Sequence, residues 1–153
     1  MLIIKSLVCA LLLLTIASSA AMADGNSRAD QVSASDARAV RAVVEAQLKA
    51  LAAEESAQAF SYASPAIKSQ FHDAATFAEM VRRSYPMLIR PASISFMRPE
   101  ASEVATTTII QAVQFRDREG NFWRAVYELE LQPDMSWRIN GCAVAPDDDS
   151  LTT

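Results

Sequence analysis

The chain has 153 residues, with 14 basic side chains against 18 acidic ones and a formal net charge of −4. This acidic balance argues against nucleic acid as a partner, because binding to a phosphate backbone requires a clustered basic surface. About 130 residues remain after a predicted N-terminal export signal, which is enough for one domain with a hydrophobic core and too few for two.

Residues 1–23 have the pattern of a cleaved secretory signal peptide. Lys5 and the amino terminus make the start positive, the apolar run "LVCALLLLTI" follows, and Ala23 ends the small-residue motif "AMA" that an export peptidase requires. The apolar run is short for a membrane span, and two serines interrupt the chain after it. We therefore expect cleavage after Ala23, export to the periplasm or the medium, and no membrane span in the mature chain.

Cleavage would also remove Cys9 and leave Cys142 as the only thiol. An internal disulfide would then be impossible, so stability would have to come from packing. Residues 24–34 and 146–153 contain few large apolar side chains, which predicts a flexible leader and an acidic flexible tail. Residues 35–145 are predicted to form a single domain.

Residues 35–85 have the periodicity of helices. Ser35 is a candidate N-cap for a first helix, and the pattern breaks near Glu54 before a second, short helix. The pair Ser64-Pro65 predicts the start of a third helix, since a capping serine is followed by proline at the first helical position. Asp73 is predicted to cap a fourth helix, which ends before Pro86.

After Pro91 the apolar residues alternate with a period of two, which indicates strands. Residues 92–97, "ASISFM", predict a first strand. Three longer strands follow, joined by the five-residue turns "DREGN" and "QPDMS", which are typical of hairpins. Each longer strand has one apolar face, made of Thr107, Ile109, Gln111, Val113 and Phe115; of Trp123, Ala125, Tyr127, Leu129 and Leu131; and of Trp137, Ile139, Gly141 and Ala143.

The alternation also predicts the register of the sheet. If Phe115 pairs with Trp123 and Leu131 with Trp137, all three apolar rows lie on one side, and a slip of one residue would expose a row to water. The sequence therefore predicts an α+β fold. Its N-terminal helices pack on one face of a curved antiparallel sheet of about four strands.

The same register places Gln111, Tyr127 and Gly141 in line across the buried face. Gly141 has no side chain, so it would leave space beside the Tyr127 ring and create a small pocket with a hydroxyl and an amide in its wall. The alternative is that Tyr127 fills this space and forms a hydrogen bond with Gln111, because buried polar groups are nearly always paired and ligand pockets usually gather more polar groups.

The inward positions of the last three strands contain no Asp, Glu, His, Lys or Arg. A proton-transferring enzyme would therefore need an acid or base from a helix. The one histidine, His72, lies beside the predicted cap Asp73, and no cysteine or carboxylate cluster at ligand spacing accompanies it. There is no glycine-rich phosphate loop. We predict no catalytic residue, no metal and no cofactor.

The other face of the sheet mixes charged and apolar side chains. A partly apolar face suits a homodimer contact, and two-fold dimers are the commonest oligomers; scattered apolar residues on an ordinary surface are the alternative. Cys142 is predicted here, near Arg124 and Glu128, whose opposite charges give its thiol no net activation. We therefore expect a small packing residue there. The candidate dimer face consists of Ile110, Phe122, Arg124, Val126 and Cys142.

The segments "ASPAIKSQF", "FAEMVRRSY", "QAVQF" and "PDMSWRINGC" resemble the bacterial family called domain of unknown function 4864, and the resemblance spans Asp36 to Ala143. The family carries glycine before the Ser-Trp of the last hairpin, where this chain has Met135. The order of helices and strands also resembles the cystatin-like superfamily of nuclear transport factor two, whose cone-shaped, often dimeric domains include isomerases, dehydratases and binding modules. The resemblance implies a fold and an exported bacterial setting, but no catalytic residues.

Two functional hypotheses follow from these observations. The first is a non-catalytic module that binds a small apolar ligand or a partner protein. The alternative is an isomerase-like or dehydratase-like enzyme in which a helix supplies the acid or base and Tyr127 and Gln111 orient a carbonyl. A third reading is a purely structural domain whose interior is filled.

Overall fold

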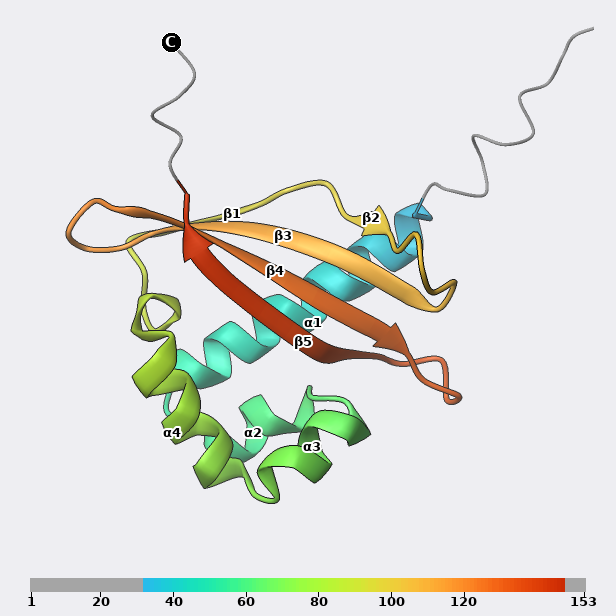
Figure 1. Ribbon diagram of the computed structural model, residues 1–153, viewed down its shortest axis with the longest axis horizontal. Helices are drawn as coiled ribbons and strands as arrows, with labels where there is room; N and C mark the ends of the chain where they lie inside the picture. The colour runs from blue at the N-terminus through green and yellow to red at the C-terminus, as the bar shows by residue number, and fades with distance from the viewer. Residues whose placement is uncertain (1–31, 148–153) are drawn as a thin grey trace, which may run out of the picture.

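Helices occupy the first half of residues 32–147, which this computed structural model describes, and strands occupy the second half (Figure 1). The predicted α+β class is confirmed. The predicted signal peptide, the leader up to residue 31 and the tail from residue 148 lie outside the described residues. The elements are α1 (Ala34–Ala52), α2 (Ser56–Ser61), α3 (Pro65–Phe71), α4 (Ala74–Ser84), the 3-10 turn η1 (Pro86–Leu88), β1 (Ser93–Phe96), β2 (Glu100–Ala101), β3 (Thr108–Arg116), β4 (Phe122–Leu131) and β5 (Trp137–Pro146).

Side-chain caps begin three of the helices. The oxygens of Ser33, Ser64 and Asp73 each accept a hydrogen bond from the backbone N–H three residues later, at 3.0, 3.2 and 2.8 Å. The caps predicted at Ser64 and Asp73 are confirmed. The first helix starts earlier than predicted, because Ser33 rather than Ser35 supplies its cap. Within residues 32–147, none of the helices has the length and apolar character needed to cross a membrane.

The two ends of the segment from α2 to η1 lie close together. Glu54, after α1, and Arg90, before β1, both have positive φ angles, 62° and 54°, in the left-handed region where chains reverse. The Arg90 Nε donates a hydrogen bond to the Ala52 carbonyl at 2.8 Å, and the Arg90 guanidinium lies 3.9 Å from the Glu54 carboxylate. These contacts hold the two ends of the segment together.

The strands form one antiparallel sheet in the order β1-β3-β4-β5, and β2 also pairs with β3. The two predicted hairpin registers are confirmed: Phe115 pairs with Trp123 and Leu131 pairs with Trp137. Both turns occupy the predicted five residues. The two-residue strand β2 was not predicted, so the sheet has five strands rather than about four.

Strand β5 contains a bulge that the alternation did not predict. Ile139 pairs with Leu129, whereas Gly141 pairs with Glu128, so Asn140 is an extra residue on β5. The carbonyl and N–H of Ile139 bind the chain between α2 and α3, at 2.8 and 2.9 Å. The bulge therefore lies where this connection meets the edge of the sheet.

The bulge reverses the side-chain pattern of the rest of β5. Cys142 pairs with Tyr127, and Ala143 pairs with Val126. Cys142 and Val144 consequently pack against the core, while Ala143 is exposed. The predicted inward positions of Gly141 and Ala143 are wrong, and so is the predicted outward position of Cys142.

Two groups of buried side chains form the interior, and α1 contributes to both. We call the larger group the sheet cluster; it consists of Val40, Val44, Leu48, Leu88, Ile109, Val113, Phe115, Ala125, Tyr127, Leu129, Trp137 and Ile139. The smaller group, the helix cluster, consists of Ala50, Leu51, Ala59, Phe77 and Val81. Figure 1 shows the geometry behind this division: α1 runs along the sheet, while α2, α3 and α4 lie together beside its edge strand β5.

Candidate ligand-binding pocket

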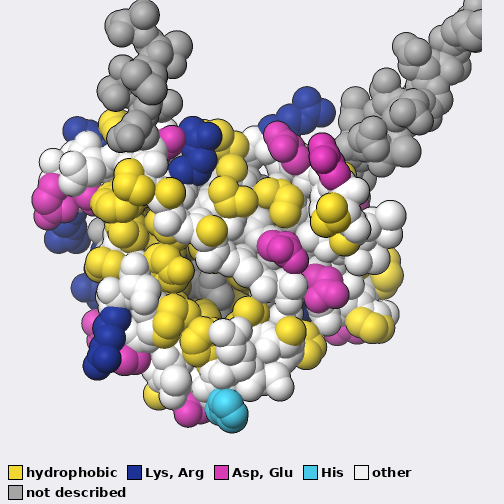
Figure 2. All heavy atoms as spheres, in the orientation of Figure 1, with side chains coloured by type: hydrophobic (Ala, Val, Ile, Leu, Met, Phe, Trp, Pro, Cys, Tyr) yellow, Lys and Arg dark blue, Asp and Glu magenta, His cyan; other side chains and the backbone are white. Residues whose placement is uncertain are grey.

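A pocket of about 460 Å³ lies where the sheet cluster and the helix cluster meet. Figure 2 shows a hollow surrounded by hydrophobic side chains on this face of the molecule, where β5 passes over the helices. Helices α1, α3 and α4 and the turn η1 supply one side of the pocket, and β4 and β5 supply the other. Most of the lining is apolar and includes Leu51, Ile67, Phe71, Phe77, Met80, Val81, Leu88 and Ile139.

Tyr127 lines this pocket from the middle of β4. The residue is 1% exposed, and its hydroxyl is buried without a hydrogen-bond partner among the described residues. Burial raises the pKa of the Tyr127 hydroxyl well above 10, with smaller contributions from the neighbouring Cys142 thiol. The phenol therefore remains protonated. It is a buried donor and acceptor of a kind that folded proteins nearly always pair.

Cys142 lines the pocket from β5, beside Tyr127. Burial raises the pKa of its thiol to about 12, and the adjacent Tyr127 hydroxyl offsets only part of that increase. At neutral pH the side chain is therefore a small, uncharged thiol, far from the thiolate state that nucleophilic catalysis needs. The alternation of apolar residues predicted Cys142 on the other face, beside Arg124 and Glu128, because it gave no indication of the bulge in β5.

Gln111 pairs with Tyr127 across β3 and β4, as predicted. Its side-chain amide, however, donates hydrogen bonds to two backbone carbonyls at 2.8 and 2.9 Å, and Gln111 is not part of the pocket lining. The predicted hydrogen bond between Gln111 and Tyr127 does not form. The amide instead holds the chain after β1 against β3.

Gly141 lines the pocket, but for a different reason from the one predicted. A Cβ atom added there would point to the opposite face of the sheet and lie 3.8 Å from the Glu128 Cβ. Gly141 therefore contributes backbone to the lining and does not create the space beside Tyr127. That space comes from the gap between β5 and the helices.

The sequence pattern did not lead to a prediction that helices form one wall of this pocket. The apolar pairs Ile67/Phe71 and Phe77/Val81, each with four-residue spacing, were the available signal, because they mark the inner sides of α3 and α4. It also missed Gln47, a buried lining residue whose amide donates to the Ala59 carbonyl at 3.3 Å. The spacing of the apolar residues does not show that a pocket separates these helices from the sheet.

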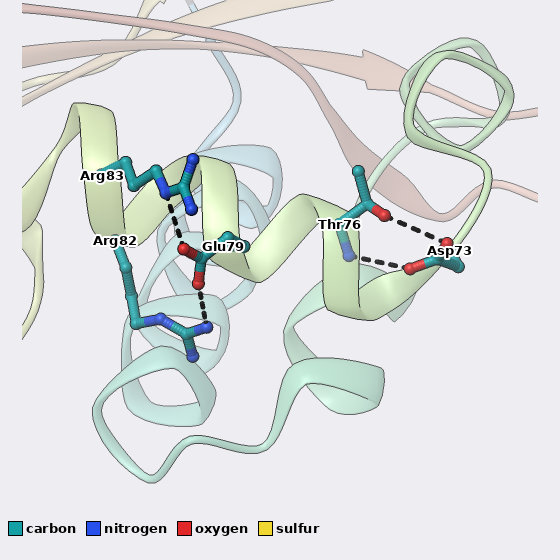
Figure 3. A network of polar contacts seen from close by, with 5 residues as sticks. All are labelled: Asp73, Thr76, Glu79, Arg82 and Arg83. Atoms are coloured by element: carbon teal, nitrogen blue, oxygen red, sulfur yellow. Dashed lines mark hydrogen bonds and ion pairs between the residues drawn. The ribbon is translucent and has the colours of Figure 1, made fainter.

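All the side chains that line the pocket are uncharged. The carboxylates of α4 lie elsewhere and are committed to the helix itself (Figure 3). Hydrogen bonds from the backbone and side chain of Thr76 lower the pKa of Asp73, and those from Arg82 and Arg83 lower the pKa of Glu79. His72 is exposed at the end of α3. Within residues 32–147, no three His, Cys, Asp or Glu side chains gather closely enough to hold a metal.

The family model for the domain of unknown function DUF4864 matches residues 33–152. The chain belongs to this family. Neither the curated proteins nor the solved structures that were compared with the chain gave a match. The matched range contains every element from α1 to β5, so the whole pocket lies inside the DUF4864 domain.

The outer face of the DUF4864 sheet carries four of the five residues predicted for a dimer contact, Ile110, Phe122, Arg124 and Val126; Cys142 lies on the inner face instead. Phe122 and Val126 are 42% and 38% exposed. Val126 pairs with Ala112 on one side and Ala143 on the other, so this part of the face is apolar and free of bulky side chains.

Arg124, on the same face, is engaged within the chain. Its guanidinium lies 2.9 Å from the carboxylate of Asp147, just beyond β5, and the same carboxylate accepts a hydrogen bond from Gln114 at 2.8 Å. Arg124 therefore ties the end of β5 to the middle of the sheet, and the apolar area beside it is the part of the predicted face that stays available.

Proposed function

We propose that this protein binds a small, mostly apolar molecule in the pocket between β5 and the helices, without acting on it chemically. The uncharged, largely apolar lining of this pocket is the observation that carries the proposal. A volume of about 460 Å³ lies within the range of about 300–1,000 Å³ that is usual for small-molecule sites. The N-terminal export pattern predicts a periplasmic or secreted location, which suits a carrier or sensor of apolar molecules.

The alternative of an isomerase-like or dehydratase-like enzyme is less well supported. General acid-base catalysis requires a group in the site whose pKa lies near the working pH. The carboxyl groups of Asp73, which caps α4, and of Glu79, on α4, have lowered pKa values instead, and neither residue lines the pocket. The neutral thiol of Cys142 and the neutral phenol of Tyr127 suit recognition better than proton transfer.

We also propose that the fold is the cone of the cystatin-like superfamily of nuclear transport factor two. Support comes from a long first helix along the inner face of a curved sheet, with shorter helices beside the edge strand β5 (Figure 1). The pocket lies between these helices and strands β4 and β5.

The binding proposal is tested by a thermal-shift screen of the protein with sterols, fatty acids and aromatic metabolites. A ligand that binds only the native state must raise the melting temperature, and at a hundred times its Kd it stabilises by about 2.7 kcal/mol. We expect Met80→Trp to fill the pocket and abolish the shift, because Met80 lines it. Met97→Trp introduces the same bulk outside the lining and serves as the matched control.

Two results would contradict the proposal. One is a screen in which no compound class raises the melting temperature. The other is a ligand whose shift survives in Met80→Trp, since that ligand would bind somewhere else.

A second proposal is self-association through the outer face of the sheet. The apolar row of Ala112, Val126 and Ala143 and the exposed Phe122 ring support it. We expect sedimentation to show a dimer that Val126→Arg converts to monomer, because the substitution buries an unpaired charge at the contact. Val104→Arg, on a loop outside the sheet and 95% exposed, should leave the dimer intact. A protein that sediments only as monomer at high concentration refutes this second proposal.

A further inference from the structure

We infer that the ligand carries an uncharged oxygen acceptor, such as a ketone or ester carbonyl, and binds with this group against the Tyr127 hydroxyl. The inference rests on the proposed function, because it assumes that a ligand occupies this pocket. It adds the chemical class of the ligand and its orientation.

The Tyr127 hydroxyl is a buried polar group of the pocket lining that is available to form a hydrogen bond with a ligand. It has no hydrogen-bond partner among the described residues, although Tyr127 is 1% exposed. Two nearby amides are committed elsewhere: Gln111 donates to two backbone carbonyls, and Gln47 donates to the Ala59 carbonyl. Gln70, the other amide of the lining, is exposed on α3. The remaining polar neighbour is the thiol of Cys142, a weak donor and weak acceptor.

A ligand that fills the pocket must therefore itself provide the hydrogen bond that this hydroxyl lacks. Leaving a buried hydroxyl without a partner lowers affinity by roughly tenfold or more. A hydrocarbon cannot form a hydrogen bond with this hydroxyl. A ligand with one polar oxygen in the right place can, so the pocket selects for that oxygen.

The arrangement of Tyr127 and Cys142 favours an acceptor on the ligand. The thiol is protonated at neutral pH, since burial raises its pKa to about 12. Its S–H can be directed at the phenol oxygen, which leaves the phenol O–H free to donate to the ligand. A carbonyl oxygen accepts such a hydrogen bond without needing a donor in return.

The same lining disfavours a charged group at this position. No Lys, Arg or His side chain is among the residues that line the pocket, so a carboxylate beside Tyr127 would be buried without a counter-charge. Lys68, on α3, is held away by a hydrogen bond from its Nζ to the Ser61 carbonyl at 3.1 Å. A fatty acid could bind only with its carboxylate at the mouth, where Tyr127 does not contact it.

The test compares three ten-carbon probes, 2-decanone, decane and decanoate, on the wild-type protein and on Tyr127→Phe at pH 8. Affinities are measured by calorimetry or by competition with a fluorescent apolar dye. Tyr127→Phe keeps the ring and removes only the hydroxyl, so we expect it to weaken 2-decanone about tenfold. Decane and decanoate should bind the variant at least as tightly as the wild type, because they make no hydrogen bond to this hydroxyl. Comparing each probe between the two proteins cancels the differences in probe hydrophobicity.

Tyr62→Phe is the matched control, because it removes a tyrosine hydroxyl that lies outside the pocket lining and accepts a hydrogen bond from Gln58. It should leave all three affinities unchanged. The inference is overturned if Tyr127→Phe leaves 2-decanone unchanged, or if it weakens decanoate as much as the ketone. If none of the three probes binds the wild-type protein, the proposed function itself is overturned. Decane binding to Tyr127→Phe that is at least as tight as to the wild type shows that the variant is folded.

Discussion

The sheet cluster and the helix cluster differ in how they are built. In the sheet cluster, Val44 from α1 packs with Phe115 from β3 and Leu129 from β4, and all three side chains are fully buried. Around the helix cluster the main aromatic contacts are local. The centroid of the Phe77 ring lies 5.4 Å from that of Phe60 and 5.6 Å from that of Phe71, and both of these rings pack against the cluster. The sheet cluster therefore joins distant parts of the chain, whereas the helix cluster joins neighbouring short helices.

This difference assigns separate tasks to the two regions. A large cluster of fully buried side chains contributes most of the hydrophobic stabilisation, because that stabilisation scales with the apolar area removed from water. The smaller helix cluster holds α3 and α4 at a distance from β5, which leaves the pocket between them. We expect mutations in the sheet cluster to change global stability, and mutations in the helix cluster to change local opening and ligand affinity.

The largest expected effect comes from Phe115→Ala. Phe115 is 0% exposed, so its loss leaves a cavity and should lower the free energy of unfolding by about 3–5 kcal/mol. Phe77→Ala should cost less, because Phe77 borders the pocket and its neighbours can relax into that space. Urea denaturation measures both. Equal losses, or a larger loss for Phe77→Ala, would reverse the roles given to the two clusters.

A second prediction concerns alkaline pH and the sheet side of the pocket. The folded Cys142 thiol has a pKa raised to about 12, whereas the unfolded thiol ionises near pH 9. Above pH 9 the unfolded state therefore binds fewer protons than the folded state, so stability falls as pH rises. Between pH 9 and pH 11 this residue should cost about 2–3 kcal/mol.

Urea denaturation of the wild type and Cys142→Ala at pH 7, 9, 10 and 11 measures this contribution together with the smaller effect of the thiol on the pKa of Tyr127, because the other titrating groups are shared. The wild type should lose stability more steeply than the variant. Parallel pH curves would show that the thiol is not buried beside Tyr127, and the predicted face of the sheet for Cys142 would then be the right one.

Ser64→Ala tests the junction between the two regions. The Ser64 hydroxyl caps α3 and also donates to the Asn140 side chain at 2.8 Å, so one substitution removes a helix cap and a link to β5. We expect a loss of about 1–2 kcal/mol. Asp73→Ala removes the cap of α4, which is exposed and makes no link to the sheet, and it should cost less.

Hydrogen exchange distinguishes these two variants further. Ser64→Ala should increase exchange in α3 and around the β5 bulge together, because the hydroxyl joins them. Asp73→Ala should increase exchange at the start of α4 alone. If Ser64→Ala affects only α3, the link to Asn140 does not couple the helices to the sheet.

Met135→Gly should raise stability by about 0.5–1 kcal/mol. Met135 has a φ of 65°, in the left-handed region that costs side-chain-bearing residues about 1–2 kcal/mol, and glycine recovers part of this despite its greater freedom when unfolded. Gly120, with a φ of 94° in the other hairpin, is the matched control: Gly120→Ala should lower the melting temperature. A lower melting temperature for Met135→Gly would contradict the prediction. The stabilised hairpin belongs to the sheet, so ligand affinity should not change.

Local signals were sufficient for most of the fold. The start of α3 follows from Ser64 and Pro65, and the start of α4 follows from Asp73, because a cap involves only residues within one turn. The hairpin registers follow from the turn lengths and from the requirement that Phe115 and Trp123 share a face. Strand β2 has only two residues, too few for any periodicity.

The bulge and the pocket depend on contacts that no local pattern encodes. Asn140 occupies the extra position on β5, and its side chain accepts a hydrogen bond from Ser64, which lies 76 residues earlier in the chain. The extra residue at this bulge places Gly141 and Cys142 on the opposite faces from those predicted. The four-residue spacing of apolar residues in α3 and α4 was the available signal, but the distance of these helices from Tyr127 depends on how the whole helical segment is attached.

The smallest expected effect, that of Gly141→Ala, separates the observed register from the predicted one. In the observed register the new methyl group points away from the pocket and lies at an ordinary 3.8 Å from the Glu128 Cβ. Because alanine restricts the unfolded chain more than glycine does, stability should stay unchanged or rise by up to about 0.5 kcal/mol, with unchanged ligand affinity. In the predicted register the methyl group would lie beside the Tyr127 ring and reduce the pocket. A melting temperature that falls together with ligand affinity would therefore place Gly141 on the helix side and remove the bulge from β5.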